Sequence, residues 1–429
     1  MNHVPEKPCK KFFACLLVLC LCLAALAYPA SAAQNVPNTP KKNCSPIVFV
    51  HGLGGWGEDT PINGVSPHWG MGAGSIKEHL GQQGYEAYAV SVGPSSSAWD
   101  RACEMYAHIT GTRVDYGEAH AKAHGHNRFG ATYEQLVPNW SKTRKLHLIG
   151  HSFGGATVRL FAQLCENGSA AECKATPAAE LSPLFSGAMK GRIASVTTLA
   201  APHNGVSSMA QPADATMVEN SGGMAMMALF GAFVPVMEYA YPARLSHFWV
   251  DARTLYQKGP KTLLANYESF SQGTDTANYD LSVDGAAQLN KGVSCLPGIY
   301  YFSYAAQTSQ PDKNGNHVPT GVVTLMFRSG AKSLGQKREP FTTAGGIRID
   351  DAWLPNDGMV NVVSALYPFN GPHQNYSAKQ LKPGIWNVMP IVTKYEHADF
   401  CGGPMRVGGA PGLNEFYLEL AQMLEGLPQ

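Results

Sequence analysis

Residues 147–155 read HLIGHSFGG, an apolar run that ends at a serine held between glycines. Gly150 and Gly154 stand two places before and two places after Ser152, so the backbone can turn sharply where a Cβ would clash. A strand-like run precedes the serine and a helix-like run, GATVRLFAQL, follows it. The stretch therefore predicts a strand-to-helix turn that exposes one serine hydroxyl.

Strands and helices alternate along the chain on both sides of this turn. We expect strands at PIVFVHG (46–52), YEAYAVSV (85–92), KLHLIG (145–150), IASVTTLAA (193–201) and WNVMPIV (386–392). We expect helices near residues 74–83, 99–109, 155–164 and 413–424. Alternation of this kind implies an α/β fold with a mostly parallel central sheet flanked by helices. The sequence shows no internal repeat, and we predict one domain over residues 44–429.

Residues 1–33 have the layout of a secretory signal peptide. Lysines precede an apolar run over residues 12–27, and small residues follow it. An uncleaved membrane anchor is the alternative, but the run is shorter than the roughly 20 residues of a membrane span. We therefore expect a secreted protein, extracellular or periplasmic, with a flexible tether at residues 34–43 and no transmembrane span in the mature chain.

Composition narrows the possible partners and the redox chemistry. The net charge of +1 over 429 residues shows no basic excess, which argues against nucleic acid as a partner. Export permits disulfides among the six cysteines that follow the leader, and Cys165 with Cys173 could close a short loop. These six are Cys44, Cys103, Cys165, Cys173, Cys295 and Cys401. Their pairing stays open.

A serine hydroxyl becomes a nucleophile when a histidine takes its proton and a carboxylate orients that histidine. Of the histidines that follow Ser152 and its helix, only His397 lies between a late strand and the final helix, where a sheet would present it beside the serine. Asp357, in LPNDGMVN, is the preferred acid because it sits in a turn after an apolar stretch. Asp350 and Asp351 are the alternatives.

An acyl-transfer site also needs donors for the oxyanion that forms during the reaction. The residue after the nucleophile supplies one backbone N–H, here Phe153, and a loop after an early strand supplies the other. VFVHGLGGWG (48–57) is such a loop, which makes Leu53 the second donor. The alternative is that its glycines only form a turn.

With these pieces in place, the chain resembles the secreted bacterial triacylglycerol lipases of the staphylococcal and thermophilic bacillus group. Matching segments include WDRACEMYAHITGTRVDYGEAHAKAHGHNRFG, SPLF, TLAAPHNG, TDTANYDLSVDGAAQLN, DDAWLPNDGMVN and EHADF. The resemblance implies the α/β-hydrolase fold, with a helical lid and a zinc-binding insertion. It also implies Ser152, Asp357 and His397 as the triad, with Leu53 and Phe153 at the oxyanion positions. The implied activity is hydrolysis of lipid esters at an oil–water interface through an acyl-enzyme.

The resemblance further implies a structural zinc ion held by two aspartates and two histidines. Asp100, His120 and His126 fall on three of those positions. For the fourth position we expect His247 of RLSHFWVD, with Asp251 as the second choice. One oxygen and two nitrogens agree with the ligand preferences of zinc.

Calcium and a lid are two further implications of the resemblance. Asp399 matches one calcium ligand and Gly321 a carbonyl ligand, but the later aspartate of the family pattern is replaced within CGGPM. The lid is expected at about residues 206–250, which include the methionine-rich run GGMAMMALFGAFVPVMEYAY (222–241). A core helix is the alternative for this run.

Two other functions compete with the lipase interpretation. An esterase or acyltransferase that acts on shorter or soluble esters would use the same residues. A non-catalytic secreted binding protein on a hydrolase scaffold is the third possibility, but the complete set Ser152, Asp357 and His397 argues against it. Acyl-chain preference and oligomeric state stay open.

Overall fold

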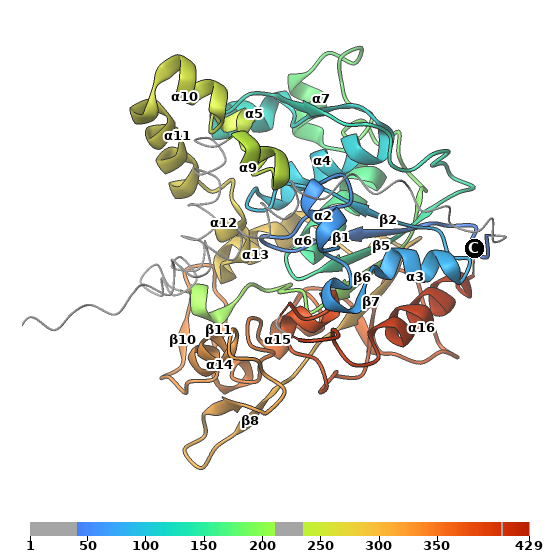
Figure 1. Cartoon of the computed structure of the whole chain (residues 1–429), viewed down its shortest axis with the longest axis vertical. Coiled ribbons are helices and arrows are strands. Elements are labelled where there is room, and N and C mark those ends of the chain that lie inside the picture. Colours follow the sequence, from blue (N-terminus) through green and yellow to red (C-terminus); the bar gives the residue numbers. More distant parts are fainter. Residues whose placement is uncertain (1–40, 211–234, 405, 429) are drawn as a thin grey trace, which may run out of the picture.

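A seven-stranded sheet forms the centre of the computed structural model, which describes residues 41–210, 235–404 and 406–428 (Figure 1). The strand order is β12-β13-β7-β6-β5-β1-β2, and every neighbouring pair is parallel. The strands are β1 (Ile47–Val50), β2 (Ala87–Val90), β5 (Leu146–His151), β6 (Ile193–Leu199), β7 (Tyr300–Tyr304), β12 (His373–Asn375) and β13 (Trp386–Val388). The parallel sheet confirms the α/β prediction, and the structure adds β7 and β12 to the expected strands.

Helices cover both faces of the sheet, as Figure 1 shows. They are α2 (Pro61–Val65), α3 (Ile76–Gln82), α4 (Ala98–Thr110), α5 (Glu118–His124), α6 (Gly154–Asn167), α7 (Ala170–Ala175), α9 (Pro235–Ala240), α10 (Ala252–Lys258), α11 (Pro260–Gln272), α12 (Ala277–Leu281), α13 (Val283–Gly292), α14 (Arg328–Leu334), α15 (Val362–Leu366) and α16 (Leu413–Glu425). Short 3-10 helices are η1 (Met71–Ala73), η2 (Ser207–Met209), η3 (Ser246–Phe248), η4 (Asp351–Trp353) and η5 (His397–Cys401). Three antiparallel pairs lie outside the main sheet: β3 (Arg113–Asp115) with β4 (Phe129–Thr132), β8 (Ser309–Pro311) with β9 (His317–Pro319), and β10 (Phe341–Thr342) with β11 (Arg348–Ile349).

Strand β1 shows why its apolar run forms a central strand rather than a surface strand. Val48 and Val50 point into the core shared with α4 and α6. Ile47 and Phe49 point to the opposite face, into the core shared with α3 and α16. All four are buried, because successive side chains of a strand alternate between two faces that are both covered.

The possible disulfide between Cys165 and Cys173 is not formed, and all six cysteines that follow the leader are unpaired among the described residues. Cys165 points into the core beneath α6, whereas the Cys173 thiol donates to the carbonyl oxygen of Phe185 at 3.4 Å. The two sulfur atoms therefore lie in different environments, although the two cysteines are close in sequence.

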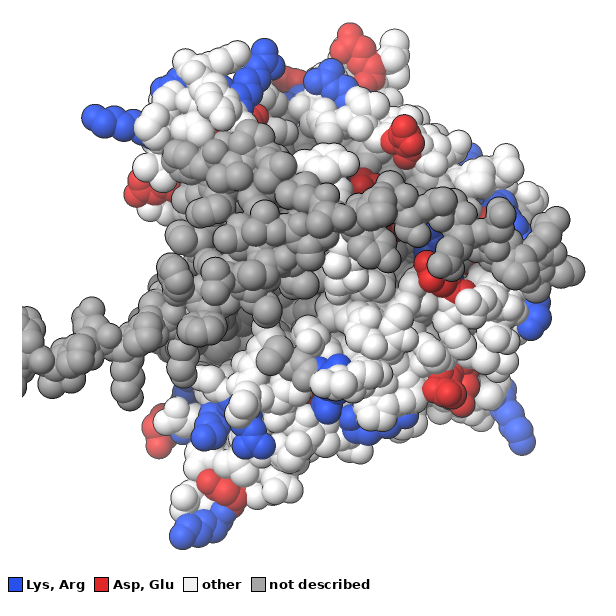
Figure 2. Space-filling model, in the orientation of Figure 1, with Lys and Arg blue, Asp and Glu red and all other residues white. Residues whose placement is uncertain are grey.

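Three expected segments lie wholly or mostly outside the described residues. The signal peptide and most of the tether fall in residues 1–40, and the central part of the expected lid falls in residues 211–234. Among the described residues, no helix is both long and apolar enough to cross a membrane. Figure 2 shows basic and acidic side chains scattered over one face without a broad area of one sign, in line with the small net charge.

Candidate active site

The turn between β5 and α6 has the geometry that its sequence predicts. The strand ends at His151 and the helix begins at Gly154, so Ser152 lies in the turn. The backbone φ of Ser152 is +55°, a left-handed conformation that is uncommon for a residue with a side chain. The Ser152 N–H donates to the carbonyl oxygen of Leu199 at the end of β6, at 2.9 Å, which helps to hold the turn.

The flanking glycines are required by close backbone contacts. A Cβ on Gly150 would lie 2.4 Å from the Gly154 carbonyl oxygen, and one on Gly154 would lie 2.2 Å from the Val50 carbonyl oxygen. Both distances are far below a normal carbon–oxygen contact, so a larger residue at either position would push α6 away from the sheet. The two glycines thus fix the start of α6 directly behind the serine.

His397 lies on η5, after the last strand of the sheet and before α16. Its Nε2 is 2.9 Å from Ser152 Oγ, and its Nδ1 is 3.0 Å from Asp357 Oδ2. All three side chains are buried. The structure therefore brings together three residues that are 245 and 40 positions apart in the sequence.

Asp357 is held by its other oxygen and by its backbone. Its Oδ1 accepts hydrogen bonds from the N–H groups of Met359, at 3.0 Å, and Val360, at 2.7 Å. Its carbonyl oxygen accepts the N–H of His397 at 3.0 Å. These bonds leave Oδ2 aimed at the imidazole.

The two alternative acids lie elsewhere. The Asp350 side chain accepts the N–H of Ala352 at 3.1 Å, and Asp351 is 3.4 Å from Lys337 Nζ. Neither carboxylate hydrogen-bonds to His397 in the structure. Geometry therefore favours Asp357 as the acid.

His151, which precedes Ser152, has a role that sequence reasoning missed. Its Nε2 lies 2.9 Å from the carbonyl oxygen of His397 and donates to it. Burial keeps the pKa of His151 well below its usual value, so the ring is neutral at physiological pH. The backbone of His397 is thus held at its N–H by Asp357 and at its carbonyl by His151.

The loop after β1 passes directly over the serine. A Cβ on Gly52 would lie 2.8 Å from the Ser152 Cβ, so only glycine allows this approach. Leu53 follows Gly52, and neither its N–H nor that of Phe153 donates to another backbone group among the described residues. Both N–H groups are therefore free to act as the expected oxyanion donors.

Arg101 is a second residue whose role sequence reasoning missed, although it lies in the quoted segment WDRAC. Its buried guanidinium donates to Thr157 Oγ1 at 2.8 Å, to the Gly93 carbonyl at 2.6 Å and to the His51 carbonyl. Burial lowers its pKa to about 9, and the carboxylate of Glu104 opposes this shift. Arg101 thereby joins the loop after β1 to the first turn of α6.

We expect Gly52→Ala to lower kcat by about 100-fold, because the new methyl group would push the Leu53 N–H away from the serine. Initial rates on a chromogenic ester would measure this effect. Gly64→Ala is the matched control, because nothing lies within 4 Å of a Cβ at that position. Equal rates for the two variants would contradict the assigned position of the loop.

A second cluster of side chains has the composition of a metal site. One ligand atom from each of Asp100, His120, His126 and Asp275 lies within 4.8 Å of the others. His120 Nε2 is 3.3 Å from Asp100 Oδ1 and 3.1 Å from Asp275 Oδ2, and His126 Nε2 is 3.2 Å from the same Asp275 oxygen. Burial alone would lower the pKa of His120, but the two carboxylates raise it to about 9.

Asp275, not His247, is the fourth member of this cluster. His247 Nε2 lies 2.8 Å from Asp100 Oδ2 and donates to it, so His247 orients a cluster carboxylate and lies outside the group. Asp251, the second choice, accepts the N–H of Thr254 at the start of α10. Asp275 was in the quoted segment TDTANYD, but only the fold shows that it reaches His120 across 155 residues.

The donor atoms of this cluster fit a metal ion. Asp100 Oδ1 and His126 Nε2 are buried and make no hydrogen bond within the described residues, although charged or polar atoms stand close to them. Buried polar atoms without partners are costly, so both would gain from a cation. Two carboxylates and two imidazoles form a donor set that suits zinc.

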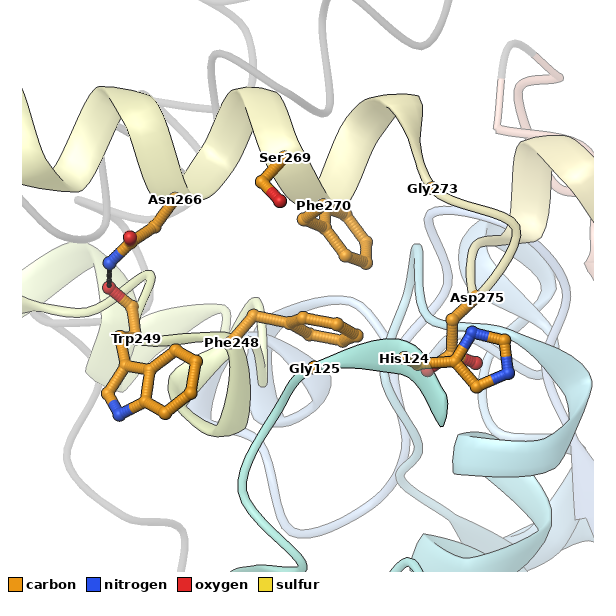
Figure 3. A pocket seen from close by; sticks show the side chains of 9 residues that line it. All are labelled: His124, Gly125, Phe248, Trp249, Asn266, Ser269, Phe270, Gly273 and Asp275. Atoms are coloured by element: carbon orange, nitrogen blue, oxygen red, sulfur yellow. Dashed lines mark hydrogen bonds between the residues drawn. The ribbon is translucent and has the colours of Figure 1, made fainter. Parts of the chain in front are cut away.

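A surface pocket adjoins this cluster rather than the serine (Figure 3). Phe248 and Phe270 face each other across it, and Asp275 lies at one end beside His124. None of its lining residues is Ser152, Asp357 or His397. The pocket is therefore separate from the Ser152 site.

The residues expected to bind calcium do not fit that ion. Arg406 Nε donates to Asp399 Oδ1 at 2.5 Å and Arg406 Nη2 donates to Asp399 Oδ2 at 2.7 Å. The same Nη2 donates to the carbonyl of Val322, which follows Gly321, at 2.7 Å. A guanidinium therefore takes both oxygens of the carboxylate that calcium would need.

Comparisons with known proteins show the family to which this chain belongs. A family model described as "Lipase-like, C-terminal domain" matches residues 43–425. Lipase 2 of Staphylococcus aureus is 34% identical over 374 residues, which are 84% of this chain and 50% of that protein. The chain thus spans about half the length of the curated relatives that it matches.

Solved structures of similar length match almost from end to end. EstA from Clostridium botulinum is 31% identical with a TM-score of 0.76, covering 96% of this chain and 98% of that one. Lipase 1 from Pelosinus fermentans is 33% identical with a TM-score of 0.73, covering 90% and 100%. The Staphylococcus hyicus lipase is 28% identical with a TM-score of 0.76, covering 92% and 98%.

Proposed function

Because this chain belongs to the family of lipase-like C-terminal domains and has the α/β-hydrolase fold, we propose that it is a secreted lipase that hydrolyses triacylglycerols. The observation that carries the proposal is the chain of hydrogen bonds from Ser152 through His397 to Asp357. The names of its relatives support lipid esters as the substrate class. The enzyme binds this substrate at an oil–water interface.

The geometry supports the following sequence of steps. His397 Nε2 takes the proton of Ser152 Oγ as that oxygen attacks the ester carbonyl carbon, and Asp357 stabilises the imidazolium that forms. The N–H groups of Leu53 and Phe153 donate to the oxyanion. His397 then returns the proton to the leaving alcohol, which departs and leaves an acyl-enzyme. Water, activated by the same imidazole, releases the fatty acid and restores Ser152.

Activity against esters of graded chain length tests the substrate class. We expect hydrolysis of long-chain triacylglycerol emulsions and a rise in rate when a short-chain ester exceeds its solubility and forms an oil phase. Both follow if the enzyme works at an interface. Activity confined to dissolved esters, with no rise at the oil phase, would favour the esterase alternative and would overturn the interfacial substrate.

Zinc is the metal that the cluster of Asp100, His120, His126 and Asp275 supports best. Four protein ligands close the coordination sphere, as in structural sites, so no step of the hydrolysis needs the ion. The ligands come from α4, from α5 and the residues after it, and from the loop before α12. A bound zinc ion would join these segments and stabilise the folded chain.

We expect removal of zinc to lower the melting temperature by about 5–10 °C while activity at moderate temperature changes little. Calorimetry before and after chelation would measure the shift. Asp275→Ala should abolish binding, whereas His247→Gln should keep one equivalent of zinc with about 10- to 100-fold weaker affinity, because His247 only orients Asp100. Loss of zinc in the His247 variant alone would show that the fourth ligand is His247.

A further inference from the structure

Arg406 and Asp399 form a two-point ion pair beside His397. Arg406 Nε and Nη2 each donate to a different oxygen of the Asp399 carboxylate, at 2.5 and 2.7 Å. The Asp399 side chain is 0% exposed, whereas that of Arg406 is 22% exposed. Two parallel charge-assisted bonds are the strongest arrangement open to an arginine and a carboxylate. The guanidinium thus neutralises a carboxylate that water does not reach.

The ion pair lies within the turn that carries His397. Asp399 Oδ2 also accepts the N–H of Glu396 at 2.8 Å, so the carboxylate closes the start of η5 around His397. The Glu396 side chain in turn accepts the N–H and hydroxyl of Thr324, at 2.6 and 2.8 Å. The position of Asp399 therefore affects where the imidazole points.

Arg406 also reaches the neighbouring loop. Its Nη2 donates to the Val322 carbonyl at 2.7 Å, so one guanidinium joins the loop at residues 320–327 to the turn at residues 396–403. A Cβ on Gly403 would lie 2.5 Å from Asp399 Oδ1, which shows how closely the turn wraps the carboxylate. Calcium prefers six to eight oxygen ligands. Both Asp399 oxygens already accept hydrogen bonds from Arg406, which explains why the expected calcium site does not fit that ion.

We propose that Arg406 is a positioning residue that holds the His397 turn in place of a bound cation, so that the activity of this chain does not depend on calcium. The proposal rests on the proposed ester hydrolysis, because its main readout is kcat. Without Arg406, the buried Asp399 carboxylate would lack a counter-charge and would become a candidate ligand for calcium together with the Val322 carbonyl.

The test compares Arg406→Gln with the parent enzyme in metal-stripped buffer after zinc has been restored, with and without calcium at about 1 mM. We expect the parent to keep the same kcat in both conditions. In Arg406→Gln without calcium, kcat should fall by about 10- to 100-fold with little change in KM, because the imidazole is misplaced. Calcium should restore most of that loss.

Two further variants separate positioning from general stability. Arg328→Gln is the matched control, since Arg328 donates to the Val323 carbonyl of the same loop at 3.2 Å but does not touch Asp399. Its kcat should match that of the parent and should not respond to calcium. Arg406→Lys keeps the charge, so its kcat should lie between those of the parent and Arg406→Gln, without a calcium response.

Three results would overturn the proposal: a parent enzyme that calcium activates, an unchanged kcat in Arg406→Gln, or a folded Arg406→Gln that calcium does not restore. Calcium binding by titration calorimetry keeps the test independent of activity. If the parent hydrolyses no ester, the proposed function fails, but binding of calcium by Arg406→Gln and not by the parent would still support the replacement. If Arg406→Gln does not fold, the comparison of the parent with Arg406→Lys decides.

Discussion

Ser152→Ala is expected to lower kcat by about 10⁶-fold and to leave the melting temperature almost unchanged. The reason is that Ser152 Oγ is the oxygen within 2.9 Å of the His397 imidazole, so its loss removes the attacking atom itself. Alanine keeps the Cβ of serine, and the turn at φ +55° meets no new contact. Initial rates and calorimetry on the same preparation would measure both quantities.

Ser96→Ala provides the control for this experiment. The Ser96 hydroxyl is buried and makes no hydrogen bond within the described residues, so its removal should change neither kcat nor stability. A Ser152→Ala enzyme that keeps a few per cent of the parent kcat would show that another residue is the nucleophile.

Asp357→Asn is expected to lower kcat by about 10⁴-fold, the size of effect known for a serine protease with the same change. The amide oxygen can still accept from Met359 and Val360, as Asp357 Oδ1 does. The NH₂ group would then face His397 Nδ1 and donate to it, which leaves the proton on Nε2. In that tautomer the imidazole cannot take the proton of Ser152.

Asp350→Asn and Asp351→Asn are the matched controls for the acid. Neither carboxylate reaches His397, so both variants should keep near-parental kcat. If one of them is inactive while Asp357→Asn is active, the acid has been assigned to the wrong residue.

Local patterns predicted the central features of the fold. The apolar runs of β1, β5 and β6 were correctly predicted to be strands, because each is buried on both faces and is bounded by turn residues. The turn at Ser152 was also predicted from a local pattern. Its glycines are needed because the backbone there lies against residues a few positions away or against the adjacent strand. The resemblance to the bacterial lipases is confirmed by the family match and by the solved structures.

Several long-range side-chain contacts outside the Ser152 site were not predicted from the sequence. His247 donates to Asp100, whereas Asp275 is itself a member of the metal-binding cluster. Only the folded positions of the two residues show this difference. Arg406 replaces an expected ion because a loop folds back onto Asp399, which no spacing rule describes. The role of Arg101 was likewise not predicted, because it depends on three hydrogen bonds to carbonyl and hydroxyl groups that only the folded chain brings together.

Covalent labelling tests directly whether Ser152 is the nucleophile. A fluorophosphonate ester reacts with a serine only when a neighbouring base activates the hydroxyl, and the phosphorus–oxygen bond that forms survives peptide mapping by mass spectrometry. We expect one label per chain, on the peptide that contains HLIGHSFGG and on Ser152 within it, with no labelling of Ser152→Ala. No label on the folded parent protein, or a label on a different serine that persists in Ser152→Ala, would contradict it.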